Sequence, residues 1–273
     1  MPLLDLYSLW LGPPGPPPPV VVVSPIAVLY QADILIDGIA ASTEGSRIRL
    51  RLVQATKEAT AFGDPARWYK PGIYAVEANG VFYYQTGNQG RLLANKLIGV
   101  TQGPSAASAV PLVVTICADT SVGSLANIWR GVNAEYAPHA VHGEVISADV
   151  STYGAGDGRC VQGRRLLRAQ QAATSGLGTA VQLGPVAAGQ RLYSALHVVG
   201  TTGTPAGTTF ALVSAAASDL VGATQRVQYV AGTSDVAGEW QELAAPVTDT
   251  WWAARWSGFS GGAFTASISA GIE

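Results

Sequence analysis

The histidines are the side chains best suited to metal or acid–base chemistry, and the chain has three of them. His139 and His142 flank a turn, without an HExxH pattern or another paired-histidine spacing around them. A metal site there would need further ligands, such as Asp149, Asp157 or Cys160. The spacing gives no support for such a site, so loop histidines that form ordinary hydrogen bonds are favoured.

The remaining candidates for catalysis are equally isolated. His197 alternates with Leu196 and Val198, which predicts the outward-facing residue of a strand. No Gly-x-Ser-x-Gly elbow occurs, and the carboxylates are scattered without a pair suited to glycoside hydrolysis. The glycines between residues 154 and 158 are not followed by the Lys-Ser/Thr of a phosphate-binding loop. The sequence therefore predicts a protein that is not an enzyme, with no catalytic, cofactor-binding or metal-binding residues and no cofactor.

Composition indicates an assembly subunit. Hydrophobic residues make up 48% of the 273 residues and charged residues only 12%, against about 25% in an ordinary globular domain. So few charges would leave a free monomer with large apolar patches, which contacts between copies would bury. The net charge of −2 gives no basic footprint for nucleic acid. Two separated cysteines, Cys117 and Cys160, exclude a disulfide framework or a four-cysteine zinc site.

Residues 1–30 read as an extended N-terminal arm. An apolar head that includes Trp10 precedes a proline run at 13–19, which favours a stiff polyproline II segment. The prolines, Asp5 and the lack of Lys or Arg argue against a signal peptide or membrane helix. We expect the arm to bury its apolar side chains on a neighbouring subunit; the alternative is a disordered tail.

From residue 31 onward the pattern predicts an all-β protein. In Arg47–Val53, strict alternation places aliphatic residues on one face and Arg47, Arg49 and Arg51 on the other. The Asn79-Gly80 pair predicts a hairpin turn within Tyr74–Tyr84. Helical spacing of apolar residues predicts one short helix at Ser124–Val132, and 164–173 suits a short linking helix or an extended linker. A boundary near residue 170 would divide a first unit, 31–170, from a second, 171–273.

The second unit has the pattern of a compact β-sandwich. Its candidate strands are Thr179–Leu183, Leu192–Val199, Thr208–Ser214, Arg226–Val230, Trp251–Trp256 and Phe264–Ala270. Alternation directs Trp251 to one side of its strand and Trp252 and Trp256 to the other. A core role for at least one of them, with the others at a subunit interface, is favoured over a sugar-stacking face.

Three readings of the arginines on Arg47–Val53 remain open. They could contact a neighbouring subunit, lie on a solvated strand face, or touch DNA phosphates. Subunit contact is favoured over the other two readings. The candidate interface residues are Trp10, Arg47, Arg49, Arg51, Trp252 and Trp256.

Several short motifs, in order, resemble the major tail tube proteins of long-tailed (siphovirus-type) bacteriophages. Ala59–Asp64, Trp68–Gly72 and Gly80–Tyr84 are similar to that family's Thr-x-Phe-Gly-Asp, Pro-Gly and aromatic-strand pattern. Arg130–Pro138 resembles the second half of the same unit. Gly178–Gly184, Leu192–Val198 and Thr248–Trp252 resemble the companion domain of longer members.

The resemblance implies a tail-tube-like β-sandwich plus a second β-sandwich, assembled into stacked rings around an open lumen. Single-domain members form six-fold rings, and a two-unit chain could form a pseudo-six-fold trimer. Phe62, Gly63 and Asp64 match the family's structural turn motif. The implied partners are further copies, the tape-measure and other tail proteins, and passing DNA bound without sequence specificity, with no membrane.

The implied location is the virion tail, assembled in the host cytoplasm. Two alternatives stay open: another virion structural protein, such as a capsid decoration or minor tail protein, and a carbohydrate-binding β-sandwich.

Overall fold

The structure, a computed structural model, describes residues 32–42, 45–58, 69–83, 111–139, 142, 147–155, 159–172, 174–206, 208–230, 236–257 and 260–273. Every regular element in these ranges is a β-strand, which confirms the all-β fold class. None of these residues belongs to a helix long and apolar enough to cross a membrane. The strands are β1 (Asp33–Ile36), β2 (Ile39–Ala40), β3 (Gly45–Glu58), β4 (Tyr69–Tyr83), β5 (Leu112–Cys117), β6 (Leu125–His139), β7 (Ser147–Gly154), β8 (Cys160–Ala172), β9 (Gly176–Leu177), β10 (Val181–Gln182), β11 (Leu192–Ala206), β12 (Thr209–Ala215), β13 (Thr224–Tyr229), β14 (Ala237–Leu243), β15 (Trp251–Ser257) and β16 (Ser260–Ile272).

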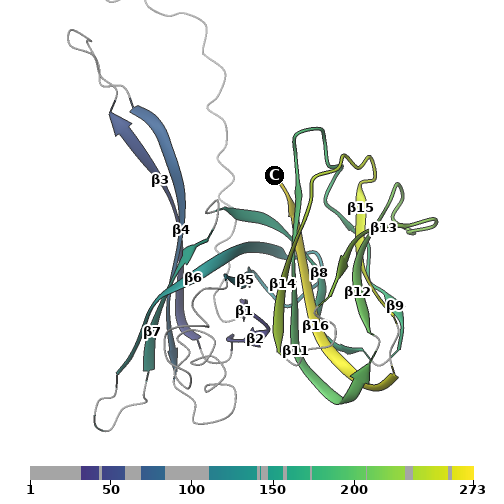
Figure 1. Ribbon diagram of the computed structural model, residues 1–273, viewed down its shortest axis with the longest axis horizontal. Helices are drawn as coiled ribbons and strands as arrows, with labels where there is room; N and C mark the ends of the chain where they lie inside the picture. The colour runs from purple at the N-terminus through teal and green to yellow at the C-terminus, as the bar shows by residue number, and fades with distance from the viewer. Residues whose placement is uncertain are drawn as a thin grey trace, which may run out of the picture.

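The C-terminal strands form a sandwich (Figure 1). A five-stranded sheet, β10-β15-β12-β13 with β9 beside β15, packs on the part of a larger sheet that holds β11, β16 and β8. Alternate residues of both sheets fill the space between them. Phe210 of β12 meets Phe264 of β16 edge-on, with ring centroids 6.0 Å apart. We call this part, with its core, the sandwich.

The larger sheet has eleven strands and curls on itself. Its main path runs β14-β11-β16-β8-β6-β5-β1-β2, with the remaining strands branching from β6. The turn between β1 and β2 touches β11, because the Gly38 N–H donates to Nδ1 of His197. Asp37 and Gly38 both have positive φ, as a tight two-residue hairpin requires. A Cβ on Gly38 would lie 2.4 Å from the Val198 carbonyl oxygen, so the approach needs glycine.

Most strands predicted in the second unit are confirmed. The predicted segments Leu192–Val199, Thr208–Ser214, Trp251–Trp256 and Phe264–Ala270 each fall on a strand of the structure. Trp252 and Trp256 point into the sandwich core, whereas Trp251 packs on the opposite side of the sheet, as alternation predicts. The strand at Arg47–Val53 is also confirmed within β3.

The predicted helix at Ser124–Val132 is wrong, because this segment begins the long strand β6. Its apolar residues do not alternate because both faces are covered. Ala126 and Ile128 belong to one buried cluster and Trp129 to another on the opposite face. A strand buried on both sides loses the period-two pattern that distinguishes it from a helix.

Two further local predictions are wrong. Asn79-Gly80 is no turn: β4 is continuous through it, with Asn79 opposite Arg49 of β3 and Ser151 of β7. Pairing on both sides overrides the local turn preference. Residues 164–172 form neither a linking helix nor a linker, but most of β8, which pairs with β16.

The division at residue 170 stays a prediction. Residue 170 lies inside β8, and β8 pairs with β6 on one side and β16 on the other. Leu166 and Leu167 are part of the sandwich core. One sheet therefore continues from the first unit into the second.

Candidate assembly surface

Strand β6 changes partners half-way along its length. Its first half lies between β5 and β8, with Ala126 opposite both Cys117 and Gly163. From Gly131 onward it pairs with β7, which pairs with β4, which pairs with β3. These strands form a four-stranded antiparallel ribbon, comprising β3, β4, β7 and residues 131–139 of β6. The ribbon projects from the body on the side away from the sandwich (Figure 1).

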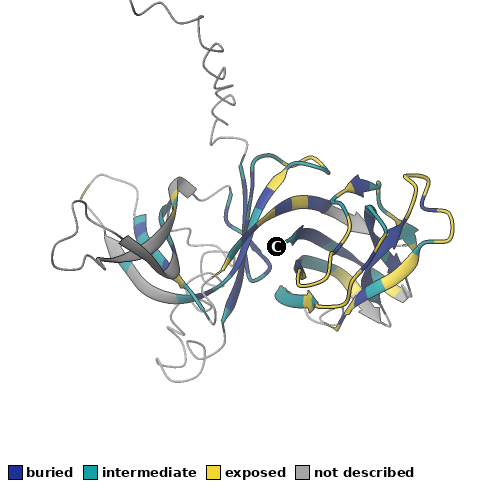
Figure 2. Cartoon of the chain, turned by 90° about the horizontal axis from the view of Figure 1, so that it is seen from above, coloured by how far each residue is buried: buried dark blue, intermediate teal, exposed yellow. Residues whose placement is uncertain are grey.

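One face of the ribbon is apolar and covered by the rest of the chain. Val76, Ala78 and Phe82 of β4 are buried, as are Ala148 and Val150 of β7. Period-two alternation places these side chains on a single face. All of them except Ala148 pack with residues of β1, β2, β5 and β6, namely Ile34, Ile36, Ile39, Leu112, Val114 and Trp129. The body of the protein thus lies against this face, whose buried residues are among those coloured dark blue in Figure 2.

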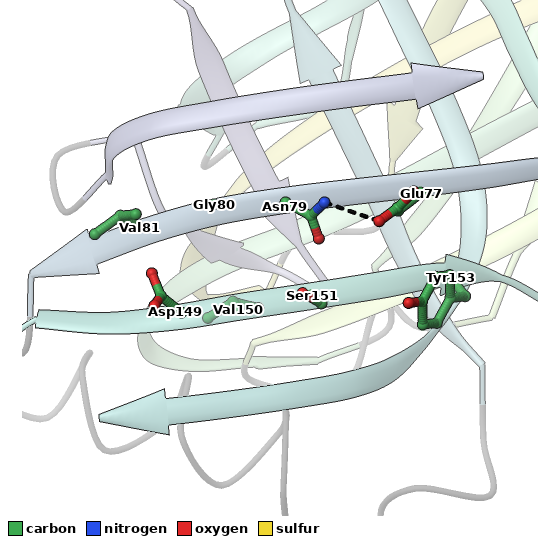
Figure 3. Close-up of a pocket in the computed structure, with 8 residues that line it drawn as sticks. All are labelled: Glu77, Asn79, Gly80, Val81, Asp149, Val150, Ser151 and Tyr153. Atoms are coloured by element: carbon green, nitrogen blue, oxygen red, sulfur yellow. Dashed lines mark hydrogen bonds between the residues drawn. The ribbon is translucent and has the colours of Figure 1, made fainter. Parts of the chain in front are cut away.

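The opposite face of the ribbon is polar, and we call it the polar face. Cross-strand register gives one row with Arg51, Glu77 and Tyr153 and a second with Arg49, Asn79 and Ser151. Arg51 lies 3.6 Å from Glu77, and Asn79 Nδ2 donates to Glu77 Oε1 at 3.0 Å (Figure 3). The Arg51 side chain is 58% exposed, so this ion pair is a weak surface contact.

An open hollow lies on this face between β4 and β7. The residues that line it are Glu77, Asn79, Gly80, Val81, Asp149, Val150, Ser151 and Tyr153 (Figure 3). Glu77 is opposite Tyr153 and Asp149 is opposite Val81, so the two carboxylates lie four register positions apart. At about 3.3 Å per residue they are too distant to share a proton or a metal ion. The lining suits a hydrated polar surface and not a catalytic centre.

The ribbon has an open edge on each side. Among the described residues, β3 pairs only with β4, over its whole length of 14 residues. Strand β6 has two edges. One edge pairs with β8 and then, further along, with β7, whereas β5 covers the other edge only as far as Gly131. Beyond Gly131, that second edge has no strand partner in the described part of the chain. Open edges are templates for pairing with another chain.

The predicted interface residues are only partly brought together. Arg49 and Arg51 are exposed on the polar face, and Arg47 precedes them in β3, opposite Val81. Trp252 is fully buried and Trp256 is 8% exposed, so these side chains belong to the chain's own core. Trp10 and the turn motif Phe62, Gly63 and Asp64 lie outside the described residues.

His197 is not outward-facing, and that prediction is wrong. It is 1% exposed, because the curled sheet covers the face of β11 opposite Leu196 and Val198. Its ring contacts Thr115 of β5 and the Gly38 backbone. Burial lowers the pKa of His197 to about 3, so the ring is neutral at ordinary pH. Sequence alternation identified the correct face, but nothing local signals that β5 and the first hairpin cover it.

The other candidate groups that the structure describes give no chemical centre, and Asp157 lies outside the described residues. No cluster of His, Cys, Asp and Glu suited to a metal ion occurs within the described ranges. Cys117 is buried and Cys160 half-buried. Burial raises the pKa of both thiols, that of Cys160 to about 12, so both are protonated at ordinary pH.

Comparisons with known proteins gave distant structural likenesses. No family model matches the chain, and no curated protein does. A chain from the tail of an empty gene transfer agent (GTA) particle is 12% identical, with a TM-score of 0.32, over 41% of this chain and 78% of that one. A chain from a native GTA virion is 14% identical, with a TM-score of 0.33, over 45% and 92%. The SPP1 Dit protein, described as a paradigm of the hub adsorption apparatus in phages that infect Gram-positive bacteria, is 10% identical, with a TM-score of 0.33, over 89% and 99%. At these TM-scores the likeness is too distant to assign a function.

Proposed function

We propose that this chain is a non-enzymatic structural subunit of a phage tail, which assembles into rings that stack into a hollow tube. The observation that carries this proposal is the ribbon with an open edge on each side. A contact between β3 of one copy and the distal half of β6 of the next would pair both open edges of the ribbon. The low charge content of the chain and its resemblance to tail tube proteins support the same assignment.

Strand directions are compatible with such a ring. All three pairings within the ribbon are antiparallel, so β3 and β6, at opposite edges, run in opposite directions. If neighbouring copies in a ring are related by rotation about an axis roughly parallel to the strands, corresponding strands of all copies point the same way. β6 of one copy then lies antiparallel to β3 of the next. This head-to-tail contact closes into a ring when the rotation closes.

The covered face of the ribbon decides which side would face the lumen. The body of each chain packs against the apolar face, so in a closed barrel this face must point outward. The polar face, with Arg49, Glu77, Asn79 and Ser151, would then line the lumen. Its mixed charges suit the passage of DNA without tight phosphate binding. The described residues hold one ribbon per chain, which favours rings in which each copy contributes four strands to the wall.

Assembly and edge blocking test the proposal together. Purified full-length protein should form rings or tubes by negative-stain electron microscopy. Neighbouring strand residues direct their N–H groups to opposite edges, and proline removes that group. Of the two variants Arg49→Pro and Leu50→Pro, one therefore removes an N–H from the open edge of β3. The other removes an N–H that pairs β3 with β4. The variant that keeps its β-fold by circular dichroism should remain dispersed, and Arg49→Ala and Leu50→Ala should still assemble.

Two outcomes would overturn the assignment. One is wild-type protein that stays monomeric at high concentration in several salts. The other is normal tube formation by both proline variants.

Labelling tests the inward orientation separately. In a Cys160→Ser background, a thiol introduced by Ser151→Cys should react with a maleimide on a bulky polymer in dispersed protein and be protected in tubes. A thiol from Gln228→Cys, exposed on the sandwich, is the control for a site on the outside of the tube. Equal labelling of Ser151→Cys in both states would place the polar face outside.

A further inference from the structure

A second group of polar side chains is buried where the larger sheet curls on itself. The Arg165 guanidinium of β8 is completely buried and forms an ion pair with Asp33 of β1. Arg165 Nη2 also donates to Ser267 Oγ of β16 at 2.9 Å, and Nη1 donates to the Asp119 carbonyl at 3.2 Å. The buried cation therefore joins the first described strand to the last.

His197 of β11 makes a second connection of the same kind. Nδ1 accepts the Gly38 N–H at 3.1 Å, so in the neutral ring the proton must reside on Nε2. Nε2 then donates to Thr115 Oγ1 of β5 at 2.8 Å. The imidazole thus bridges the β1–β2 turn, β5 and the sandwich strand β11, with both ring nitrogens satisfied.

The β1–β2 hairpin (residues 33–40) has further polar contacts at its ends. Ser42 Oγ donates to Asp33 Oδ1 at 2.6 Å and accepts the Ile34 N–H at 2.9 Å. The Asp37 N–H donates to the Val113 carbonyl at 2.7 Å. All four residues of β1 are buried. The hairpin is therefore held by directional contacts as well as by apolar packing.

We infer that this buried polar group, which comprises Asp33, Arg165, Ser267, Thr115 and His197, is a clasp that makes the N-terminal hairpin and the C-terminal sandwich unfold as a single cooperative unit. Apolar contacts tolerate sliding, but a buried charge is stable only while its partners hold it in one geometry. Separation of the hairpin from β11 and β16 would leave Arg165 or Asp33 unpaired in the interior. The inference does not depend on tube assembly.

The clasp has a mechanical consequence. The chain enters β1 directly from residue 32, so a pull on the preceding segment acts on Asp33 within two residues. The ion pair with Arg165 passes that load to β8, and Ser267 passes it to β16. A load applied to the chain just before β1 would thereby reach the sandwich.

Hydrogen exchange of the full-length chain, measured by mass spectrometry, tests the coupling. Arg226→Gln weakens a contact entirely within the C-terminal sandwich, where Arg226 donates to Ser214 Oγ at 2.8 Å and to Asp249 at 3.0 Å. If the two parts open together, this change speeds exchange in both β12 and the distant hairpin by the same factor, roughly tenfold. Faster exchange in β12 with an unchanged hairpin would overturn the inference.

A mild change within the clasp provides the second measurement. Thr115→Val keeps the side-chain shape but removes the hydroxyl that pairs with His197. Hairpin exchange should then speed by roughly tenfold or more, with less change in β12. Adding Arg226→Gln should no longer accelerate the hairpin by the factor seen in β12.

Thr209→Val, which removes a hydroxyl paired with Ser257 at 2.9 Å inside the sandwich, is the matched control and should preserve the coupling. Coupling that survives Thr115→Val unchanged would contradict the clasp.

Discussion

The sandwich and the ribbon are built from the same kind of strand, yet only the sandwich closes its own surfaces. In the sandwich, two sheets cover each other, with large side chains such as Trp252, Phe210 and Phe264 between them. The ribbon has one covered face, one polar face and an open edge on each side. Open strand edges are templates for pairing with another chain. The ribbon is therefore the part of the described chain that gains most from another copy.

The difference separates two kinds of residue that the sequence does not distinguish. Tryptophans and arginines were both expected at subunit contacts. The structure places Trp252 and Trp256 in the chain's own core and Arg49 and Arg51 on the exposed polar face. Substitutions in the sandwich should therefore change the stability of the single chain, whereas substitutions on the ribbon should change assembly.

The largest expected effect is loss of the sandwich core by Trp252→Ala. Trp252 is fully buried, and its indole N–H donates to the Gly184 carbonyl at 2.9 Å. Truncation leaves a large cavity and an unpaired carbonyl, which should lower the free energy of unfolding by about 3–5 kcal/mol in urea denaturation. Trp251→Ala, on the half-buried opposite side of the strand, is the control and should cost clearly less. Equal losses would contradict the two-sided assignment of the tryptophans.

A second difference should appear between two glycines of the larger sheet. A Cβ on Gly163 would lie 2.1 Å from the Ala270 carbonyl oxygen, a backbone atom that cannot move aside cheaply. Gly163→Ala should therefore destabilise the protein by about 3 kcal/mol in the same assay. A Cβ on Gly200 would have no heavy atom within 4 Å. Gly200→Ala should be neutral or slightly stabilising, and a large loss there would contradict the strand packing described.

How far the sequence predicted the fold depends on how many faces each strand exposes. The strand at Arg47–Val53 was predicted because its polar face is open, so alternation survives. The β6 segment was misread as a helix because β5 and β8 flank it while both its faces are covered. Alternation correctly placed His197 opposite Leu196 and Val198. Its burial depends on a sheet that curls over some 160 residues of sequence, which no local pattern encodes.

The candidate surface was predicted in part for the same reason. The exposed arginines Arg49 and Arg51 were identified from their spacing. Their cross-strand partners Glu77 and Asn79 were not, because β4 was divided at a predicted turn. The clasp partners Asp33 and Arg165 are 132 residues apart, and neither has a distinctive local context.

Acid should weaken the junction between the β1–β2 hairpin and the sandwich, because His197 lies there. In the folded protein, burial and the charge of Arg165 lower its pKa to about 3, although the charge of Asp33 raises it. Between pH 6.5 and 3 the unfolded chain binds a proton at this site that the folded chain does not, so stability falls as pH decreases. The loss should reach about 2 kcal/mol by pH 5, at roughly 1.4 kcal/mol per pH unit, and fade out above pH 6.5. His197→Gln, which can accept from Gly38 and donate to Thr115, should remove this part of the slope in urea titrations. An unchanged slope would show that another group is responsible.

The smallest effect on the single chain is expected on the polar face of the ribbon. Arg51 and Glu77 are 3.6 Å apart with side chains 58% and 23% exposed, so their ion pair should contribute at most about 0.5 kcal/mol. Arg51→Glu should therefore leave the urea midpoint nearly unchanged, yet place two like charges side by side in every copy of a ring. Because this repulsion repeats around a closed lumen, assembly should require more salt, which screens it over about 8–10 Å.

The exchange Arg51→Glu with Glu77→Arg restores the pair and should restore the salt dependence of tube formation measured by light scattering. If the single variant assembles like the wild type, the polar face of one copy does not lie near those of its neighbours. The contrast between a self-sufficient sandwich and a ribbon completed by other copies would then fail at this face.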